Sequence, residues 1–302
     1  MKTYSDIHNE IIAFIQNGAM GSWFNNKDLY YELGLDTQIE RKNANKVLSR
    51  MTLDGLIQPH RMKHGVHRAK DQHIEKIDWR SADASSELDL LLPFAMERFV
   101  KILPRNIIVI AGAPDAGKTA WAIDFTKKNM FNHTINYFSS EMGELELAVR
   151  LANHKDIKKA EWIFNPYDRT NNFADVIDPN AINIIDFLEI TEEFYLVARE
   201  IKDLYDVLNK GICIVCLQKN PSSKFAKVDL GRGGALSLEK ARLYLALDPN
   251  ETRVIKAKNW RIPTKNPNGM RFTYNLIGGA EFVNVQEHAR NEDDTLNKFN
   301  SM

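Results

Sequence analysis

Residues 106–119 constrain the fold of this chain more than any other stretch. An apolar run at 106–111 is followed by the loop sequence GAPDAGKT at 112–119 and then by an amphipathic segment. The run is typical of a buried strand and the segment of a helix, so a strand must become a helix within a loop that contains two glycines. A unit of this kind belongs to folds in which strands and helices alternate.

The loop also matches the P-loop pattern of Gly, four residues, Gly, Lys and Ser or Thr. Glycines let the backbone curl so that successive N–H groups face phosphates, and the helix N-terminus adds the positive end of its dipole. We therefore expect ATP and Mg²⁺ as ligands, with the lysine on the β and γ phosphates and the threonine on the metal. The predicted nucleotide-binding residues are Gly112, Ala113, Pro114, Asp115, Ala116, Gly117, Lys118 and Thr119.

Strands and helices alternate beyond this loop. Helices are expected to begin at Gly117 and Gly143, with a third at 192–208, and further apolar strands at 135–138, 181–185 and 211–217. An earlier stretch, residues 88–103, is apolar at helical spacing and stops at Pro104. Apolar strands separated by helices predict an α/β fold, with a mostly parallel sheet that helices cover on both faces.

Acidic residues stand at the ends of two expected strands. In YFSSEMGELELAVRL, residues 137–151, a strand ends in Glu141 and a helix follows. A carboxylate there can orient and deprotonate the water that attacks the γ-phosphate, although a glutamate can also cap the following helix. Asp186 ends the next apolar strand and is the predicted Mg²⁺ residue, acting through water; Asp178, which precedes Pro179, is the competing choice.

The P-loop and the Ser-Ser-Glu-Met stretch resemble those of the RecA/DnaB superfamily of P-loop ATPases, whose catalytic glutamate follows a Ser-x pair and precedes Met. The resemblance covers roughly residues 100–284 and implies a RecA-like ATPase fold. It also implies that Gln218 senses the γ-phosphate, and that the loop at 219–234 lines a channel and grips single-stranded DNA. Basic residues of this loop can instead be merely solvated; they are Lys219, Lys224, Lys227 and Arg232, with Lys224 and Lys227 the predicted DNA contacts.

The segment AKNWRIPTKNPNGMRFTYNL resembles the Lys-x-Arg segment of the DnaB group, whose basic residues reach the ATP of the neighbouring subunit. Arg261 is the predicted arginine of this kind. The pattern departs from the family because two residues separate Lys258 from Arg261, so either Lys256 or Lys258 can be the lysine. ATP held between subunits implies a homo-oligomer, either a ring or a filament. The predicted catalytic residues are Glu141, Lys118, Gln218 and Arg261.

Residues 4–72 are expected to form a winged helix-turn-helix. The pattern predicts a first helix, a short helix capped by Asn26, a longer helix at 39–53 and a hairpin with its turn at His64-Gly65. Excess positive charge on the longer helix and the hairpin suits duplex DNA. The alternative is a protein-docking module with a solvated basic face. The predicted DNA contacts are Arg41, Lys42, Lys46, Arg50, Arg61, Lys63 and Arg68.

The expected organisation follows from these segments. Residues 1–77 would be the winged helix-turn-helix domain, 78–87 a small and polar linker, 88–285 the RecA-like ATPase domain and 286–302 a polar, flexible tail. With no apolar run near the roughly 20 residues that cross a bilayer and no signal segment, we expect a cytoplasmic protein without membrane contact. Cys213 and Cys216 lie in an apolar run, so we expect them in the core.

Together these features predict an oligomeric, DNA-binding ATPase that couples ATP hydrolysis to DNA remodelling or translocation in replication or recombination, in the manner of a helicase. In this it resembles RepA-like and phage-encoded RecA-type ATPases. The DnaB-type helicases carry a different, helical N-terminal domain, so the resemblance does not extend to residues 4–72. The alternative function is an ATP-gated DNA-binding regulator or adaptor without motor activity. A small-molecule kinase is the weakest alternative, because no Arg-rich lid is visible in the sequence.

Overall fold

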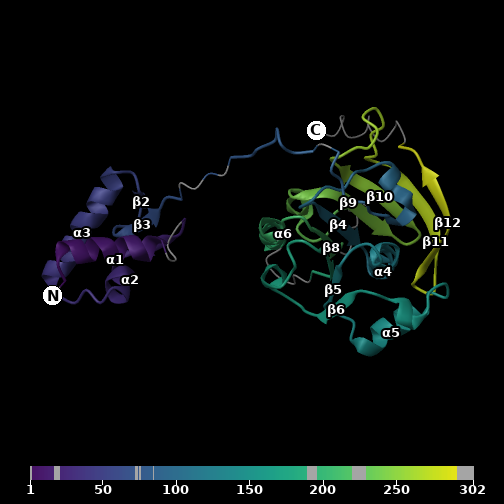
Figure 1. Cartoon of the computed structure of the whole chain (residues 1–302), viewed down its shortest axis with the longest axis horizontal. Helices are drawn as coiled ribbons and strands as arrows, with labels where there is room; N and C mark the ends of the chain where they lie inside the picture. The colour runs from purple at the N-terminus through teal and green to yellow at the C-terminus, as the bar shows by residue number, and fades with distance from the viewer. Residues whose placement is uncertain are drawn as a thin grey trace. The chain divides into compact units, whose positions relative to one another are not determined.

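The computed structural model describes residues 2–16, 21–71, 74, 76–83, 85–188, 196–219 and 229–290, and Figure 1 draws the whole chain. The chain divides into two compact units, Met1–Ala82 and Asp83–Met302. Each unit has its own apolar core, and the two are described separately.

The N-terminal unit packs helices against a small antiparallel sheet. β3 lies between β1 and β2 and pairs antiparallel with both. Asn25 caps the second helix, because its side chain accepts a hydrogen bond from the backbone N–H of Asp28, so the expected cap at Asn26 is wrong by one residue. The elements are α1 (Tyr4–Phe14), β1 (Trp23–Asn25), α2 (Asn26–Glu32), α3 (Gln38–Leu53), β2 (Ile57–Pro59) and β3 (Val66–Ala69).

Helical periodicity explains how α3 lies in this unit. Val47, Leu48 and Met51 are buried in one cluster with Ile7 and Ile11 of α1. The opposite side of α3 is exposed, as a 3.6-residue period requires of an amphipathic helix. The helix expected at 39–53 is therefore confirmed as an amphipathic helix, and the basic residues on its exposed side are Arg41, Lys42, Lys46 and Arg50.

The C-terminal unit is built on a sheet of nine described strands, in the order β12, β11, β10, β9, β4, β8, β7, β5, β6. Neighbouring strands are parallel from β9 to β6, and β10, β11 and β12 extend the sheet with antiparallel pairs. The strands are β4 (Ile107–Gly112), β5 (Ile135–Ser139), β6 (Asn165–Asp168), β7 (Ile182–Asp186), β8 (Ile212–Gln218), β9 (Ala241–Asp248), β10 (Glu251–Ala257), β11 (Arg271–Ile277) and β12 (Glu281–His288).

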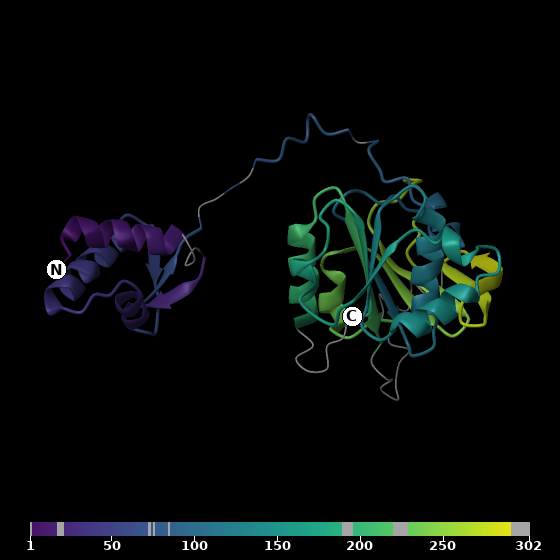
Figure 2. The ribbon, with the colours of Figure 1, turned by 60° about the horizontal axis from the view of Figure 1, so that its bottom comes forward.

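Helices lie on both faces of this sheet, as Figure 2 shows with α4 and α6 on opposite sides. In β4, Ile108 and Ile110 join the core that contains Trp121 of α4, whereas Ile107 and Val109 join the core of α6. Both faces exclude water, which is why the parallel strands read as continuous apolar runs. The predicted α/β fold with a mostly parallel sheet is confirmed. The helices are α4 (Lys118–Asn129), α5 (Glu144–Ala152) and α6 (Leu196–Val207).

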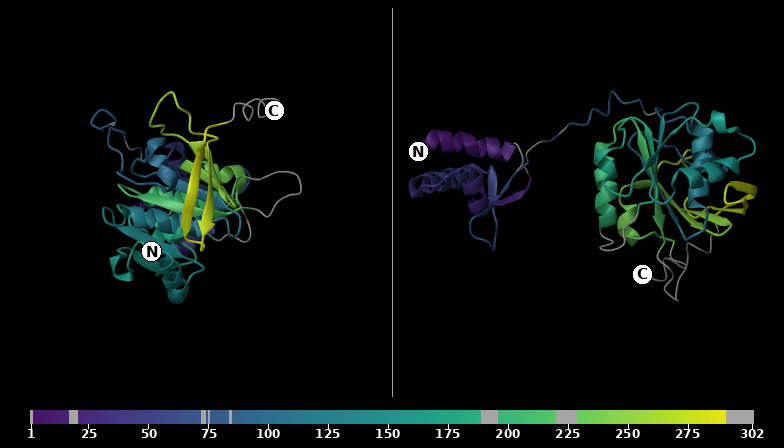
Figure 3. Two further views of the ribbon diagram at one scale, coloured as in Figure 1. Left: turned by 90° about the vertical axis from the view of Figure 1, so that its right-hand side faces the viewer. Right: turned by 90° about the horizontal axis from the view of Figure 1, so that it is seen from below.

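The antiparallel end of the sheet was not predicted. Strands β11 and β12 form a ribbon at one edge, drawn in yellow at the front of the left view in Figure 3. β12 continues to His288, so residues 286–288 belong to the sheet and the expected start of the tail at residue 286 is wrong. Cys213 and Cys216 are free and buried on opposite faces of β8, which confirms their expected place in the core.

The helix suggested by the spacing of residues 88–103 does not form. The chain forms no α-helix there but only a short 3-10 segment, η2 (Pro93–Arg98), in which Phe94 and Ala95 adopt positive φ angles of 64° and 53°. Pro93 has no N–H to donate and disfavours helix before it. The apolar residues are nevertheless buried against the sheet, so their spacing reflects packing of an extended chain; they are Leu90, Leu92, Met96, Val100 and Ile102.

The start of α3 carries a reciprocal capping box. The Thr37 hydroxyl accepts from the backbone N–H of Glu40 at 3.2 Å, and the Glu40 carboxylate accepts from the backbone N–H groups of Thr37 at 3.0 Å and Lys2 at 2.7 Å. The Thr37 hydroxyl, together with the backbone of Lys2 and Thr37, lowers the pKa of Glu40 from 4.5 to about 2. The charged form of Glu40 therefore stabilises the N-terminal unit.

Replacing Glu40 with Gln should lower the stability of this unit at neutral pH, because an ionised acceptor is lost. Since the folded pKa lies below the unfolded one, the stabilisation is present above pH 4.5 and is lost as the pH falls towards about 2. Urea unfolding followed by circular dichroism should show wild type and variant converging over this range. Glu32→Gln, at an exposed position on α2, is the control and should follow wild type. Equal stabilities at neutral pH would contradict the expectation.

Candidate functional site

A cavity of about 300 Å³ opens where the parallel strands end. The carboxyl ends of β4, β5, β7 and β8 meet at one edge because these strands are neighbours and parallel. Residues that lie far apart in the sequence, and that were each predicted for a role in ATP chemistry, line this cavity together. They are Lys118, Thr119, Glu141, Asp186 and Gln218.

The glycine loop forms one wall of the cavity. Gly117, with φ of 90°, turns the chain into α4, and this left-handed conformation favours glycine over residues with a Cβ. A Cβ at Gly112 would stand 2.7 Å from Cγ of Lys118, so the lysine can fold over the loop only because position 112 is glycine. The Lys118 ammonium donates to the carbonyls of Gly112 at 3.2 Å and Ala113 at 2.9 Å.

These features suit a phosphate group. The first turn of α4 lines the cavity, and the unpaired N–H groups of a helix start attract anions. A lysine that donates to main-chain carbonyls can exchange those acceptors for phosphate oxygens. Thr119 and Asp186 supply the oxygen atoms that Mg²⁺ prefers. The donor set of the cavity therefore fits a magnesium nucleotide.

Asp186 is held at the end of β7 by a buried tyrosine. The hydroxyl of Tyr137 donates to Oδ2 of Asp186 at 2.5 Å, and both residues are buried. Burial, and then the negative charge of Asp186, raise the pKa of Tyr137 well above its ordinary value, so the phenol stays a neutral donor. The competing Asp178 does not line the cavity; its carboxylate accepts from the backbone N–H of Asn180, before β7 begins.

The serine pair before Glu141 joins β5 to β7. The hydroxyl of Ser139 accepts from the backbone N–H of Met142 at 2.8 Å, which turns the chain around Glu141. Ser140 donates its hydroxyl to the carbonyl of Phe187 at 3.0 Å and its N–H to the carbonyl of Asp186 at 3.1 Å. These bonds place Glu141 and Asp186 on the same cavity, and they give the Ser-Ser pair a structural role that the sequence analysis did not identify.

Lys219 is the first basic residue after Gln218. It was expected to be a solvated or DNA-binding residue of the loop, but its side chain is buried. Its ammonium is buried and donates to Oδ1 of Asp248 at 2.8 Å, and Arg253 holds the other oxygen of that carboxylate at 2.8 Å. Burial by itself raises the pKa of Asp248, but the two cations outweigh it and the net pKa is lowered. Lys219 is therefore a structural ion-pair partner, and Lys224 and Lys227 lie outside the described residues.

Arg261 does not line this cavity. Its guanidinium makes two bonds to the carboxylate of Glu87, at 2.9 and 2.8 Å, and donates to the carbonyl of Glu97 at 2.6 Å. Lys256 donates to the carbonyl of Leu238, and Lys258 is exposed. The role predicted for Arg261 concerns a second copy of the chain, so it stays a prediction.

Some residues of the cavity were missed by the sequence analysis. Arg150 of α5 lines it and pairs with Glu146 at 3.0 Å, while Leu276 reaches it from the end of β11 and Gly279 from the turn between β11 and β12. The Gly278-Gly279 pair between two alternating segments was a usable hairpin signal. Nothing local to the sequence indicated that this turn lies beside the P-loop, because the strand order sets that proximity.

The basic residues predicted for the N-terminal unit differ in their surroundings. Arg41 donates to the carbonyl of Leu35 at 2.8 Å and lies over the ring of Tyr30, and Arg68 donates to the carbonyl of Gly21 at 2.8 Å. Their side chains are therefore partly engaged within the fold. The remaining predicted residues are exposed on α3 and on the turn between β2 and β3; they are Lys42, Lys46, Arg50, Arg61 and Lys63.

No family model and no curated protein matches this chain. Solved structures that align with it include a DnaB-like replicative helicase, at 17% identity and a TM-score of 0.48 over 68% of this chain and 66% of that one. A KaiC-like protein from Pyrococcus horikoshii aligns at 17% identity and a TM-score of 0.47, over 67% of this chain and 99% of the KaiC-like chain. The RadB recombinase aligns at 14% identity and a TM-score of 0.44, over 61% of this chain and 92% of the RadB chain.

These TM-scores are below 0.5 and the identities are below 20%, so the alignments do not assign an activity to this chain. The chain spans 66% of the length of the helicase chain that it matches. In the part of the chain that the structure describes, no helix has the length and apolar character needed to cross a membrane.

Replacing Asp248 with Asn should destabilise the C-terminal unit by roughly 3 kcal/mol, because the Lys219 ammonium would be left buried without its counter-ion. Urea unfolding is the measurement. Asp206→Asn removes an exposed pair with Lys202 four residues away on α6 and should change stability by less than about 0.5 kcal/mol. Equal effects of the two substitutions would show that Lys219 is not held as described.

Proposed function

We propose that this chain binds and hydrolyses ATP and couples the reaction to the remodelling of DNA or to translocation along it, as a helicase-like ATPase. The observation that carries the proposal is the convergence of Lys118, Thr119, Glu141, Asp186 and Gln218 on one cavity at the ends of parallel strands. The family resemblance of the P-loop and of the Ser-Ser-Glu-Met stretch supports the same reaction.

Each residue of the cavity would have a separate role in ATP binding or hydrolysis. Main-chain amides of residues 112–119 would hold the phosphates, and Lys118 would reach the β and γ phosphates. Bound Mg²⁺ would neutralise developing charge on the phosphates. Thr119 would hold the metal directly and Asp186 through water, and the Tyr137 hydroxyl would keep the Asp186 carboxylate in place. Glu141 would orient the attacking water and accept its proton, and Gln218 would sense the γ-phosphate.

The N-terminal unit would be a winged helix-turn-helix that contacts duplex DNA. Its three described helices and its antiparallel sheet β1-β3-β2 support this, with α3 as the recognition helix and the β2–β3 turn as the wing. Exposed lysine and arginine side chains on α3 favour phosphate contact over a neutral protein surface. Arg41 and Arg68, which are engaged within the fold, would contribute less than Lys42, Lys46 and Arg50.

A homo-oligomer would complete the site. Among the residues that the structure describes, Arg150 is the arginine on the cavity, and its guanidinium is paired with Glu146. Phosphoryl transfer is often accelerated by an arginine that a neighbouring molecule supplies. Arg261 would play this part in a ring or filament, and it would have to exchange Glu87 for phosphate oxygens when it does so.

The test of ATP chemistry compares Lys118→Ala with Glu141→Gln. Lys118→Ala should lose ATP binding and turnover, whereas Glu141→Gln should keep binding and lower kcat by about 10² to 10⁴, the usual contribution of a positioned base. Nucleotide binding is measured with a fluorescent ATP analogue, and turnover by phosphate release.

Glu144→Gln is the matched control for the base, because Glu144 is exposed three residues further along the same segment. It should turn over ATP at the wild-type rate. Hydrolysis that survives in Lys118→Ala, or that is unchanged in Glu141→Gln, would remove the proposed reaction from this cavity.

The test of DNA contact uses Lys46→Ala and Arg50→Ala on α3. Each should weaken duplex binding across all sequences and reduce the slope of log affinity against log salt by about 1, because one phosphate contact is lost. Fluorescence anisotropy at several salt concentrations measures both quantities. Lys159→Ala, at an exposed position in the C-terminal unit, is the control and should bind as wild type does.

Unchanged affinity and slope in both α3 variants would favour protein docking for this unit. If duplex binding is confined to one defined site and DNA leaves the ATPase rate unchanged, the chain would be an ATP-gated regulator or adaptor instead.

A further inference from the structure

His154 is a buried imidazole that follows α5. It is 2% exposed, and neither Nδ1 nor Nε2 has a hydrogen-bond partner among the residues that the structure describes. Buried side-chain nitrogens are almost always hydrogen-bonded, so a buried imidazole with two unpaired nitrogens needs an explanation. Burial, and to a smaller degree the nearby Lys127, lower the pKa of His154, whereas Asp124, Glu281 and Asp156 raise it, and the net pKa is lowered.

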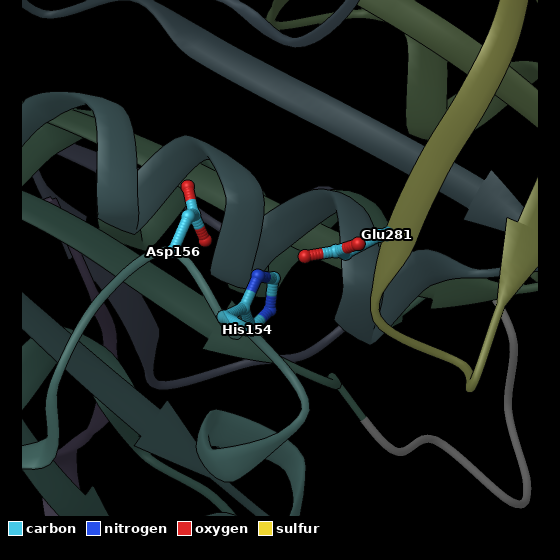
Figure 4. A group of neighbouring side chains, drawn as sticks. All are labelled: His154, Asp156 and Glu281. Atoms are coloured by element: carbon cyan, nitrogen blue, oxygen red, sulfur yellow. The ribbon is translucent and has the colours of Figure 1, made fainter.

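Two carboxylates lie beside this ring. Asp156 follows His154 by two residues, and Glu281 begins β12 at the edge of the sheet. The potential ligand atoms of the three residues all lie within 4.8 Å of one another. Figure 4 shows one ring nitrogen of His154 facing the gap between the two carboxylates. The side chain of Glu281 has no hydrogen bond or ion pair to any described residue.

We propose that His154, Asp156 and Glu281 bind a divalent metal ion, with Zn²⁺ as the best match. One imidazole nitrogen and two carboxylate oxygens form a ligand set that Zn²⁺ accepts, with water in the fourth position. Zn²⁺ bonds are about 2.0 to 2.2 Å long, which places tetrahedral ligand atoms about 3.4 Å apart. The group must therefore contract slightly, and Asp156, which is exposed, has room to move.

The main competitor for this site is Lys127. Its ammonium contacts both oxygens of Asp156, at 3.0 and 2.8 Å, and it would have to give up one of them to the metal. Asp124, the other acid lining the small cavity here, is already paired with Lys128. The carboxylates of Asp156 and Glu281 face one ammonium, that of Lys127, which among the described residues pairs with Asp156 alone, so the group carries net negative charge, which favours a divalent cation.

A metal at this point would join two segments that border the ATP cavity. The side chain of Asn153, next to His154, donates to the carbonyl of Gly278 at 3.1 Å, and Gly279 lines the cavity. The ion would therefore clamp the β11–β12 turn to the end of α5, which also carries Arg150. Metal binding itself does not depend on the proposed function, whereas an effect on ATP affinity would rest on it.

The experiment titrates the metal-free, full-length protein with Zn²⁺ against a chromophoric chelator, without nucleotide. Wild type should show one tight site, and Glu281→Gln and Asp156→Asn should each weaken it at least tenfold. Glu287→Gln is the matched control, because Glu287 lies on the same strand and pairs with Arg98. It should bind Zn²⁺ as wild type does. Circular dichroism confirms that each variant is folded.

A second readout separates this site from adventitious binding by exposed histidines. Zn²⁺ should raise the melting temperature of wild type and of Glu287→Gln, and should leave that of Glu281→Gln unchanged. Zn²⁺ binding of equal affinity in wild type, Glu281→Gln and Asp156→Asn would overturn the proposal, as would the absence of a tight site in wild type. Either result can occur with ATP hydrolysis intact, so failure here is distinct from failure of the proposed function.

Discussion

The junction between β4 and α4 determines where the chemistry of the C-terminal unit can take place. At this junction the chain leaves a buried strand and starts a helix through the left-handed Gly117, and the Lys118 side chain folds back over Gly112. The helix start then faces the same edge of the sheet as the ends of β8, β7 and β5. Glu141, Asp186 and Gln218 are close to the phosphate site because the strands that precede or carry them run parallel to β4.

Hydrogen bonds between the ends of β5 and β7 fix the candidate residues more closely than the strand order alone. Tyr137 reaches from β5 to Asp186 at the end of β7, and Ser140 bonds to the same strand end from the neighbouring turn. Glu141 and Asp186 are thus held by a polar network whose parts come from adjacent strands. Such a network is rigid only when each buried member is paired, a condition that Tyr137 and Asp186 meet.

The errors in the sequence analysis share a physical cause. Apolar residues in 88–103 recur at helical spacing, yet they pack as an extended chain, because Pro93 prevents the helix and the sheet offers an apolar surface. Lys219 looked like a loop cation because the sequence does not reveal Asp248, which ends β9 on the other side of β4 and accepts a hydrogen bond from the Lys219 ammonium at 2.8 Å. Contacts between residues far apart in the sequence decided both the conformation of residues 88–103 and the burial of Lys219. A local sequence pattern does not indicate such contacts.

Neighbouring residues in the sequence were enough to determine the local chemistry of this protein: a glycine-containing loop between a strand and a helix, acids at strand ends, buried apolar strands and the amphipathic α3. These depend on backbone geometry and on periodicity, which are properties of neighbouring residues. The tertiary structure alone decided which of these pieces meet. It brought Arg150 and Gly279 to the cavity and placed Glu281 beside His154, because the order of strands in a sheet is settled by the packing of the whole core.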